Sequence, residues 1–170
     1  MKKLHELGKL IVACETYIMH DGKVLMHKRA ESKKKFPGYW IGPGGHVDEN
    51  EDVLTTALRE VKEETGVILS EKDVKLKVLA FHHHIDRNEV WIEYLFRATI
   101  PSHQEIRNTA EGSSEWIKVD DVKKLKNIFP PSKHYLNHIL NDSTGILYNY
   151  SQWKNAELVN VISERIDKDY

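Results

Sequence analysis

Three glutamates near the end of one predicted helix constrain this chain more than any other feature. Residues 59–66 read REVKEETG. Glu63 and Glu64 lie three and four positions after Glu60, so a helix would place all three on one face. Like charges at this spacing cost roughly 0.2–0.5 kcal/mol per pair. Glu63 and Glu64 also oppose the negative carbonyl end of a helix that Gly66 is expected to terminate. Because helix stability alone disfavours this pattern, we expect these carboxylates to bind a cation.

The segment before this helix is predicted to be a tight loop. Residues 42–45 read GPGG, a sequence that cannot be helical. Asn50 is the predicted N-cap, with Glu51 and Asp52 in the first turn, where negative charge is favourable. The predicted buried stripe of the helix is Leu54, Ala57, Leu58 and Val61. At about 100° per residue the glutamates lie roughly a third of a turn from this stripe, at its edge, where a cleft can form.

The other segments predict a mixed α/β chain, with a sheet between helices. Asp21-Gly22 is a strong hairpin signal between two apolar segments, and a second hairpin is expected around residues 86–89. The predicted strands are 9–19, 23–29, 74–85, 90–100 and 115–119. The predicted helices are 120–126, 132–141 and 151–166. We expect a single domain over residues 1–170, in which 143–170 form a C-terminal helical extension that could serve as a dimerisation element or a lid.

Composition narrows the class of protein. The 170 residues are 40% hydrophobic and 30% charged, typical of a globular domain, and the net charge is −1. A charge near zero gives no global attraction to a nucleic-acid polymer or a membrane surface. No apolar stretch approaches the roughly 18–20 residues that span a bilayer. Cys14 is the only cysteine, which excludes an internal disulfide and fits a reducing compartment. We therefore expect a cytoplasmic protein.

The loop and the helix together resemble a known motif. Residues 45–67, GHVDENEDVLTTALREVKEETGV, resemble the Nudix box at all of its fixed positions. Trp40 and Pro43-Gly44 resemble the usual lead-in. The chain is therefore identified as resembling the Nudix hydrolases, specifically those of MutT type. This resemblance implies a mixed β-sheet sandwiched between α-helices. It also implies Mg²⁺- or Mn²⁺-dependent hydrolysis of a nucleoside diphosphate linked to another group.

The resemblance also implies roles for individual residues. Glu60, Glu63, Glu64 and the carbonyl of Gly44 would bind the metal, in keeping with the oxygen ligands that Mg²⁺ prefers. Arg59 would hold one of these glutamates in place, and Glu51 would fix the helix against the loop. The segment EGSSEWI at 111–117 resembles one that carries a further acidic residue to the metal, which makes Glu111 a candidate ligand. The candidate catalytic residues are Arg59, Glu60, Glu63 and Glu111, with Glu60 or Glu111 as the general base.

Three other clusters have simpler interpretations. In His82-His83-His84 only His82 and His84 share a face of a strand, so surface or cleft-lining histidines are favoured over a zinc site. Lys33-Lys34-Lys35 could meet substrate phosphates, although a solvated loop is the favoured interpretation. Core packing is the favoured role for Trp40, Trp91 and Trp116, although each could stack on a base.

The motif indicates a reaction and leaves the substrate open. Relatives that act on ADP-ribose carry a proline where this chain has His83, and those that act on dinucleoside polyphosphates carry a tyrosine where it has Ile85. The local likeness is to MutT-type enzymes, which predicts a (d)NTP or oxidised (d)NTP as substrate. In those enzymes an asparagine reads the base, and here Lys133 stands in its place. A lysine only donates hydrogen bonds, which argues against strict 8-oxo-guanine selectivity.

Two rival classes are less well supported. Isomerases of isopentenyl diphosphate have a degraded box and use a cysteine near the glycine loop, whereas this box is intact and Cys14 is distant in sequence. Non-catalytic nucleotide sensors usually lose a glutamate or add a DNA-binding domain, and neither change is seen. A small-molecule nucleotide is thus the expected partner, with a homodimer as a further possibility.

Overall fold

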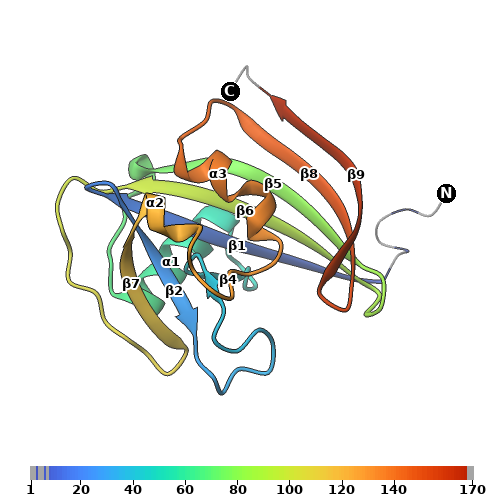
Figure 1. Ribbon diagram of the computed structural model, residues 1–170, viewed down its shortest axis with the longest axis horizontal. Coiled ribbons are helices and arrows are strands. Elements are labelled where there is room, and N and C mark those ends of the chain that lie inside the picture. Colours follow the sequence, from blue (N-terminus) through green and yellow to red (C-terminus); the bar gives the residue numbers. More distant parts are fainter. Residues whose placement is uncertain (1–2, 4–5, 7, 168–170) are drawn as a thin grey trace.

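One mixed β-sheet organises the chain (Figure 1). The computed structural model describes residues 3, 6 and 8–167. In this part the strand order is β3-β2-β1-β6-β5-β8-β9, with β4 paired to β1 and β7 paired to β2. β1 pairs with β6 and β5 with β8 in parallel, and the other pairs are antiparallel. The strands are β1 (Lys9–His20), β2 (Lys23–Arg29), β3 (Trp40–Ile41), β4 (Gly44–His46), β5 (Val74–His84), β6 (Glu89–Thr99), β7 (Gly112–Lys118), β8 (Ile146–Lys154) and β9 (Glu157–Asp167).

Helices cover both faces of this sheet. The helices are α1 (Val53–Thr65), α2 (Val119–Val122) and α3 (Ser132–Leu140), with a 3₁₀ turn at Glu71–Asp73. Tyr135 and Ile139 of α3 pack with Tyr17 and Leu95 on one face. Ala57 of α1 packs with Cys14 and Phe96 on the other. The predicted mixed sheet between helices is therefore confirmed. No helix in the described part of the chain is long and apolar enough to cross a membrane.

Helix α1 begins two residues later than the predicted N-cap would place it. Asp52 is the N-cap, and its carboxylate accepts hydrogen bonds from the backbone N–H groups of Leu54 and Thr55 at 2.8 and 2.9 Å. Asn50 instead has φ 72°, a turn conformation that precedes the helix. The predicted C-terminus is confirmed, since Gly66 has φ 80° and its N–H donates to the carbonyl of Lys62.

Most of the predicted elements are confirmed, with some shifts. The first two predicted strands and the 74–85 and 90–100 strands each agree with the structure to within one residue at either end. β7 starts three residues before the predicted strand, and 120–126 contribute only the short α2. The predicted GPGG loop is only partly irregular, because its last two glycines belong to β4, which pairs with β1.

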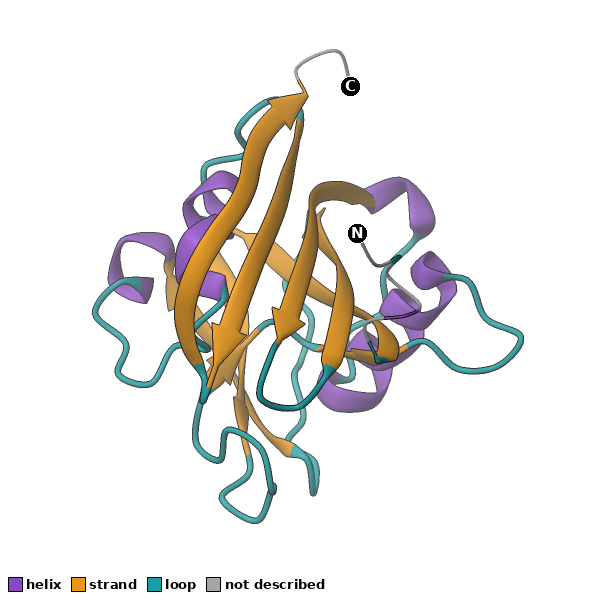
Figure 2. Cartoon of the chain, turned by 90° about the vertical axis from the view of Figure 1, so that its right-hand side faces the viewer, coloured by secondary structure: helices purple, strands orange, loops and turns teal. Residues whose placement is uncertain are grey.

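The predicted helix at 151–166 is wrong, as is the helical extension at 143–170. Residues 146–167 form the hairpin β8–β9 instead, and β8 extends the sheet in parallel alongside β5 (Figure 2). Burial alternates along β8 with the two-residue period of a strand. Asn155 and Ala156 have φ 52° and 63°, which is the backbone of a tight hairpin turn. The misleading signal was the helix-like spacing of four apolar residues that are exposed on β9, namely Leu158, Val159, Ile162 and Ile166.

We expect Asp52→Ala to lower the free energy of unfolding by about 1 kcal/mol, because two N–H groups at the start of α1 lose their acceptor. Denaturant unfolding would measure the change, with Glu49→Ala, an exposed residue just before the helix, as the matched control. A loss no larger than that of the control would contradict Asp52 as the N-cap.

Candidate active site

Helix α1 carries its three glutamates at different depths, and two of them lie against the backbone of β4. Glu64 is buried, and its Oε2 accepts a hydrogen bond from the N–H of Gly44 at 2.9 Å. Glu60 is half-buried against Gly45, where an added Cβ would lie 2.6 Å from its Cδ. The Glu63 side chain is 59% exposed. The structure thus brings together Gly44, Glu60 and Glu64, with Glu63 at the solvent edge of the same helix face.

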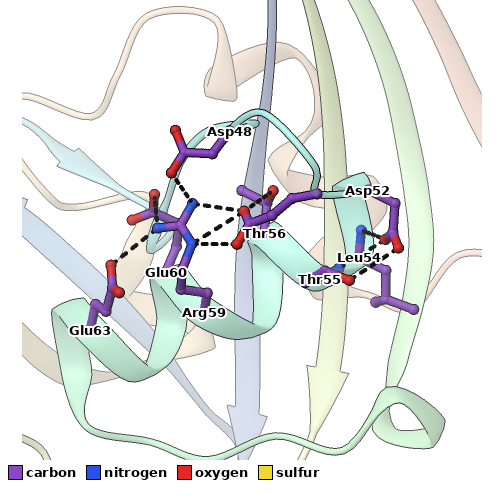
Figure 3. Close-up of polar contacts among 9 residues, drawn as sticks. Asp48, Asp52, Leu54, Thr55, Thr56, Arg59, Glu60 and Glu63 are labelled. Atoms are coloured by element: carbon purple, nitrogen blue, oxygen red, sulfur yellow. Dashed lines mark hydrogen bonds and ion pairs between the residues drawn. The ribbon is translucent and has the colours of Figure 1, made fainter.

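Arg59 joins most of the charged groups around α1 (Figure 3). Its Nε donates to Oε1 of Glu51 at 2.9 Å, and Nη2 lies 3.3 Å from Oδ2 of Asp48. Its Nη1 donates to both Glu60 and Glu63, at 2.9 and 3.1 Å. The predicted contact of Arg59 with a box glutamate is therefore present, and Arg59 also pairs with Glu51. One guanidinium sets the orientation of the helix, the preceding loop and two candidate ligands, a task suited to its planar set of donors.

The electrostatics of the site favour binding of a cation. Burial raises the pKa of Glu64 to about 8, and repulsion from Glu60 and Glu111 adds to this shift. Burial also raises the pKa of Glu60, partly offset by Arg59. Carboxyl groups that are both desolvated and close to one another resist ionisation. A bound cation would relieve this repulsion, so the cost of grouping these acids becomes a source of metal affinity.

Glu111 lies near this cluster and is held by a lysine. It stands just before β7, its carbonyl accepts a hydrogen bond from the N–H of Ala30, and its charge contributes to the raised pKa values of Glu60 and Glu64. Its carboxylate is 3.0 Å from Nζ of Lys33 and 54% exposed. Glu111 therefore lies near the predicted site, and its carboxylate is paired with Lys33 in the structure.

His27 is a member of this cluster that the sequence analysis missed. It is buried in β2, its Nε2 is 3.9 Å from Oε1 of Glu64, and its Nδ1 lies 3.0 Å from Oγ of Ser114. Burial lowers the pKa of His27, which favours the neutral ring. In the sequence it is one histidine in the strand segment KVLMHKR, and only the β2–β7 pairing and the position of α1 bring it to Glu64.

The donor set fits a hard divalent cation, although the side chains are not gathered around one point. Among the described residues, no three His, Cys, Asp or Glu side chains stand as a ready-made metal cage. Glu60 and Glu63 point to Arg59, and Glu111 points to Lys33. All candidate ligands are oxygen donors, as Mg²⁺ and Mn²⁺ prefer, and two of them are partly desolvated carboxylates. Metal binding would require a rotation of side chains, with the backbone already in place.

A cavity of about 480 Å³ opens beside the glycine loop. Gly44 and Gly45 form part of its wall, so the same backbone separates the cavity from the carboxylates of α1. Five basic residues line it, namely Arg29, Lys33, Lys34, Lys35 and Arg87. The sequence favoured a plain solvated loop for the three lysines, whereas the structure places all of them along the cavity. A volume of this size accommodates a small-molecule ligand, and the basic residues suit an anionic one.

The histidines and tryptophans divide between the core and this cavity. His84 and Trp91 line the cavity, which confirms the cleft-lining interpretation for His84. His82 is 1% exposed and lies in the interior of the sheet, so a surface position for it is wrong. Trp40 is buried in the core, as expected, and Trp116 packs against the α1 side of the sheet.

Cys14 lies next to the glycine loop, contrary to what its distance in sequence suggested. The pairing of β1 with β4 sets it opposite Gly45, and it lines the cavity. Burial raises the pKa of its thiol to about 12, so the thiol stays protonated at neutral pH. Because the thiolate is the nucleophilic form, this environment does not support cysteine chemistry.

The family is decided by comparison with known proteins. The profile of the NUDIX domain matches residues 12–139, three quarters of the chain. This chain belongs to the Nudix hydrolase family. Among solved structures, the MutT protein from Bacillus halodurans superposes with a TM-score of 0.74 at 25% identity, covering 94% of this chain and 99% of its own. That coverage includes much of β8–β9, which the domain profile does not reach.

Relatives within the family carry different names. The m7GpppN-mRNA hydrolase NUDT17 of Danio rerio is 31% identical over 124 residues, which cover 61% of this chain and 39% of that protein. The nucleoside triphosphatase NudI of Escherichia coli is 28% identical over 115 residues, covering 62% of this chain and 79% of that protein. The match spans well under half the length of NUDT17 from either Danio rerio or Xenopus laevis. These names therefore suggest candidate substrates for this Nudix domain and assign none.

We expect Gly45→Ala to lower hydrolytic activity by about tenfold or more, because its Cβ would displace the Glu60 carboxylate. The melting temperature should change little, since the displaced group is the end of a flexible side chain. Gly22→Ala is the matched control. It has φ 68° and no atom within 4 Å of an added Cβ, so it should lower the melting temperature and preserve activity. Equal activity in the two variants would contradict a role for this close approach.

Proposed function

We propose that the protein is a Mg²⁺- or Mn²⁺-dependent pyrophosphohydrolase that converts a (d)NTP or an oxidised (d)NTP to the monophosphate and pyrophosphate. One observation carries this proposal, which is that the acidic face of α1 and the basic cavity meet at the Gly44–Gly45 backbone. The acidic side chains of α1 would bind the metal, and the basic side chains of the cavity would bind the phosphates. A nucleoside triphosphate needs both the metal and the basic side chains. Together they would neutralise its phosphate chain beside a cavity that holds the nucleoside.

Glu60, Glu63, Glu64 and the carbonyl of Gly44 would hold the metal, with Glu111 as a further ligand. A divalent cation there supplies charge neutralisation at the phosphate oxygens and lowers the pKa of a bound water. The chain itself supplies the position of the ligands. Arg59 orients Glu60 and Glu63, and the Gly44 N–H orients Glu64. The rigid helix fixes the backbone of these ligands, so only their side chains would have to reorganise around the metal.

The proton of the attacking water would pass to Glu60 or Glu111. Glu60 sits at Gly45, where the cavity and the acidic face meet, and Glu111 lies beside the lysines of the cavity. Lys33 contacts Glu111 in the structure, so binding of phosphate by Lys33 would release this carboxylate toward the site. The basic side chains of the cavity would hold the phosphate chain and exclude bulk water from it.

The names of the relatives support a nucleotide substrate and leave open which group is joined to its nucleoside diphosphate. NudI is named for nucleoside triphosphates and NUDT17 for a capped mRNA, so both names contain a nucleoside on a phosphoanhydride. The Nudix domain of Shewanella oneidensis NrtR was solved with ADP-ribose, at a TM-score of 0.62 and 25% identity. Dinucleoside polyphosphates, ADP-ribose and nucleotide sugars are therefore the alternatives to test. Lys133 does not decide between them, because it is exposed on α3 and lies outside the cavity lining.

We expect Glu63→Gln to lower kcat by about a hundredfold or more while the fold is retained, because a charged ligand becomes neutral at an exposed position. Pyrophosphate release from each (d)NTP, 8-oxo-dGTP, ADP-ribose, diadenosine tetraphosphate and a nucleotide sugar would be measured with Mg²⁺ and then with EDTA. Glu157→Gln on β9 is the control and should behave as wild type. Activity of Glu63→Gln within a few-fold of wild type, or activity that survives EDTA, would contradict the proposed metal site.

A further inference from the structure

The inner wall of the cavity is acidic, unlike the rest of its lining. Glu15 on β1 and Glu93 on β6 both line the cavity and are only 5% and 6% exposed. In the parallel β1–β6 register Glu93 is opposite Ala13, two residues from Glu15, so the two carboxyl groups share one face and lie diagonally across neighbouring strands. Neither belongs to α1. The mechanism proposed above uses neither of them, so the presence of two buried acids in a binding cavity requires another explanation.

Glu93 is held in one orientation by groups behind it. Among the described residues, the hydroxyl of Tyr135 donates to Oε2 at 3.5 Å, and Nε2 of His82 lies 3.5 Å from the same oxygen without forming a hydrogen bond. These long contacts fix the carboxyl group without saturating it. Its other oxygen, Oε1, is therefore available to a molecule in the cavity. A buried acceptor that lacks a full set of partners is costly unless a ligand supplies them.

The C-terminal hairpin sets the proton that faces Glu93. The indole N–H of Trp153 donates to Oγ of Ser151 at 2.7 Å, and this hydroxyl lies 2.8 Å from Nδ1 of His82. A serine oxygen that accepts from Trp153 can give its own proton to Nδ1. A ring that accepts at Nδ1 holds its proton on Nε2, which lies 3.5 Å from Oε2 of Glu93. Through Ser151, strand β8 thereby orients the ring of His82 behind Glu93.

An aromatic surface lies beside the acids. Trp91 is half-buried in the cavity lining, two residues from Glu93 on the same strand face. The neighbouring His84 is 6% exposed, and its Nδ1 has no hydrogen-bond partner among the described residues. Nζ of Lys35 lies 5.4 Å from the centroid of the Trp91 ring and the His46 ring centroid lies 5.2 Å from it, so a flat heterocycle would displace Lys35 to stack on Trp91 with its edge toward Glu93. Stacking on an aromatic ring combined with hydrogen bonds to the edge is how proteins read a base outside a duplex.

We infer that this cavity selects a guanine base, and that Glu93 reads its edge by accepting hydrogen bonds from N1–H and the 2-amino group. This inference rests on the proposed function, because it assigns the nucleoside of the same substrate. A carboxylate only accepts hydrogen bonds, and Oε1 carries enough lone pairs to accept from two adjacent N–H donors. Guanine presents that pair. Adenine presents an acceptor at N1, and uracil presents one N–H between two carbonyl groups, so each would place an acceptor against the carboxylate.

The position of Glu93 in the cavity agrees with a substrate whose base lies at β6 and whose phosphates point toward α1. Gly44 and Gly45 line the cavity beside α1, and Glu93 lines it from the central strand β6. A nucleotide with its base at Glu93 can then extend its phosphates toward the carboxylates of α1. Oxidation at C8 leaves N1–H and the 2-amino group unchanged, so the inference covers guanine with or without this lesion.

The first test is kcat/KM of the full chain with Mg²⁺ for GTP, ITP, ATP and UTP. ITP differs from GTP only by loss of the 2-amino group. We expect GTP to exceed ITP by about tenfold or more and to exceed ATP and UTP by a larger factor. A GTP/ITP ratio near one, or a preference for ATP or UTP, would overturn the inference and leave the proposed hydrolase intact.

The second test is Glu93→Gln. An amide accepts at one atom and donates at the other, which suits the N1–H and O6 edge that guanine and hypoxanthine share. The GTP/ITP ratio should therefore fall to about one, a change in specificity that a general loss of packing would not produce. Glu115→Gln, an exposed glutamate on β7, is the control and should keep the wild-type ratio. A wild-type ratio in Glu93→Gln would also overturn the assignment.

Binding of GDP and IDP to the wild-type chain, measured by calorimetry, separates the two proposals. If no triphosphate is hydrolysed but GDP binds about tenfold tighter than IDP, the proposed function fails and the guanine site stands. If triphosphates are hydrolysed and the two diphosphates bind equally, the guanine site fails and the hydrolase stands.

Discussion

Strand β1, strand β4 and helix α1 approach one another so closely at Gly44 and Gly45 that no side chain fits between them. A Cβ on Gly44 would lie 2.8 Å from Cα of Glu15, and one on Gly45 would meet the carboxylate of Glu60. This approach lets the N–H of Gly44 bond to Glu64 and makes the same two residues a wall of the cavity. The acidic helix face and the binding cavity are neighbours only because backbone alone separates them.

The site concentrates charge that would be unfavourable elsewhere in a protein. Burial of Glu64 and Glu60 raises their pKa values, and Arg59 offsets part of that cost by pairing with several carboxylates at once. Glu15 shows the same physics in the cavity, where burial and then repulsion from Glu93 raise its pKa well above the usual range. Acids kept in such positions are typical of binding and catalytic sites, where a ligand offsets the cost of desolvation.

The local elements could largely be predicted, whereas the errors came from competing patterns. Asn50 and Asp52 are both good N-caps by residue type, and only the left-handed backbone of Asn50 decides between them. In the C-terminal segment, apolar residues at helical spacing concealed a hairpin whose β8 pairs with β5, more than 60 residues earlier in the chain. Spacing along the chain cannot report such a pairing, because the stabilising partner lies elsewhere in the sequence.

The sequence by itself determined the family, the helix that carries Arg59, Glu60, Glu63 and Glu64, and the glycine loop before it. It could do so because these groups lie within 23 consecutive residues, where helical periodicity alone sets their relative positions. Only the tertiary structure brought His27 to Glu64, Cys14 to Gly45, and Glu15 to Glu93. It also placed Ser151 behind His82 and turned the lysine run toward the cavity. Each of these contacts joins residues from different strands or loops, so its existence depends on strand order and register, which are set by the packing of the whole sheet.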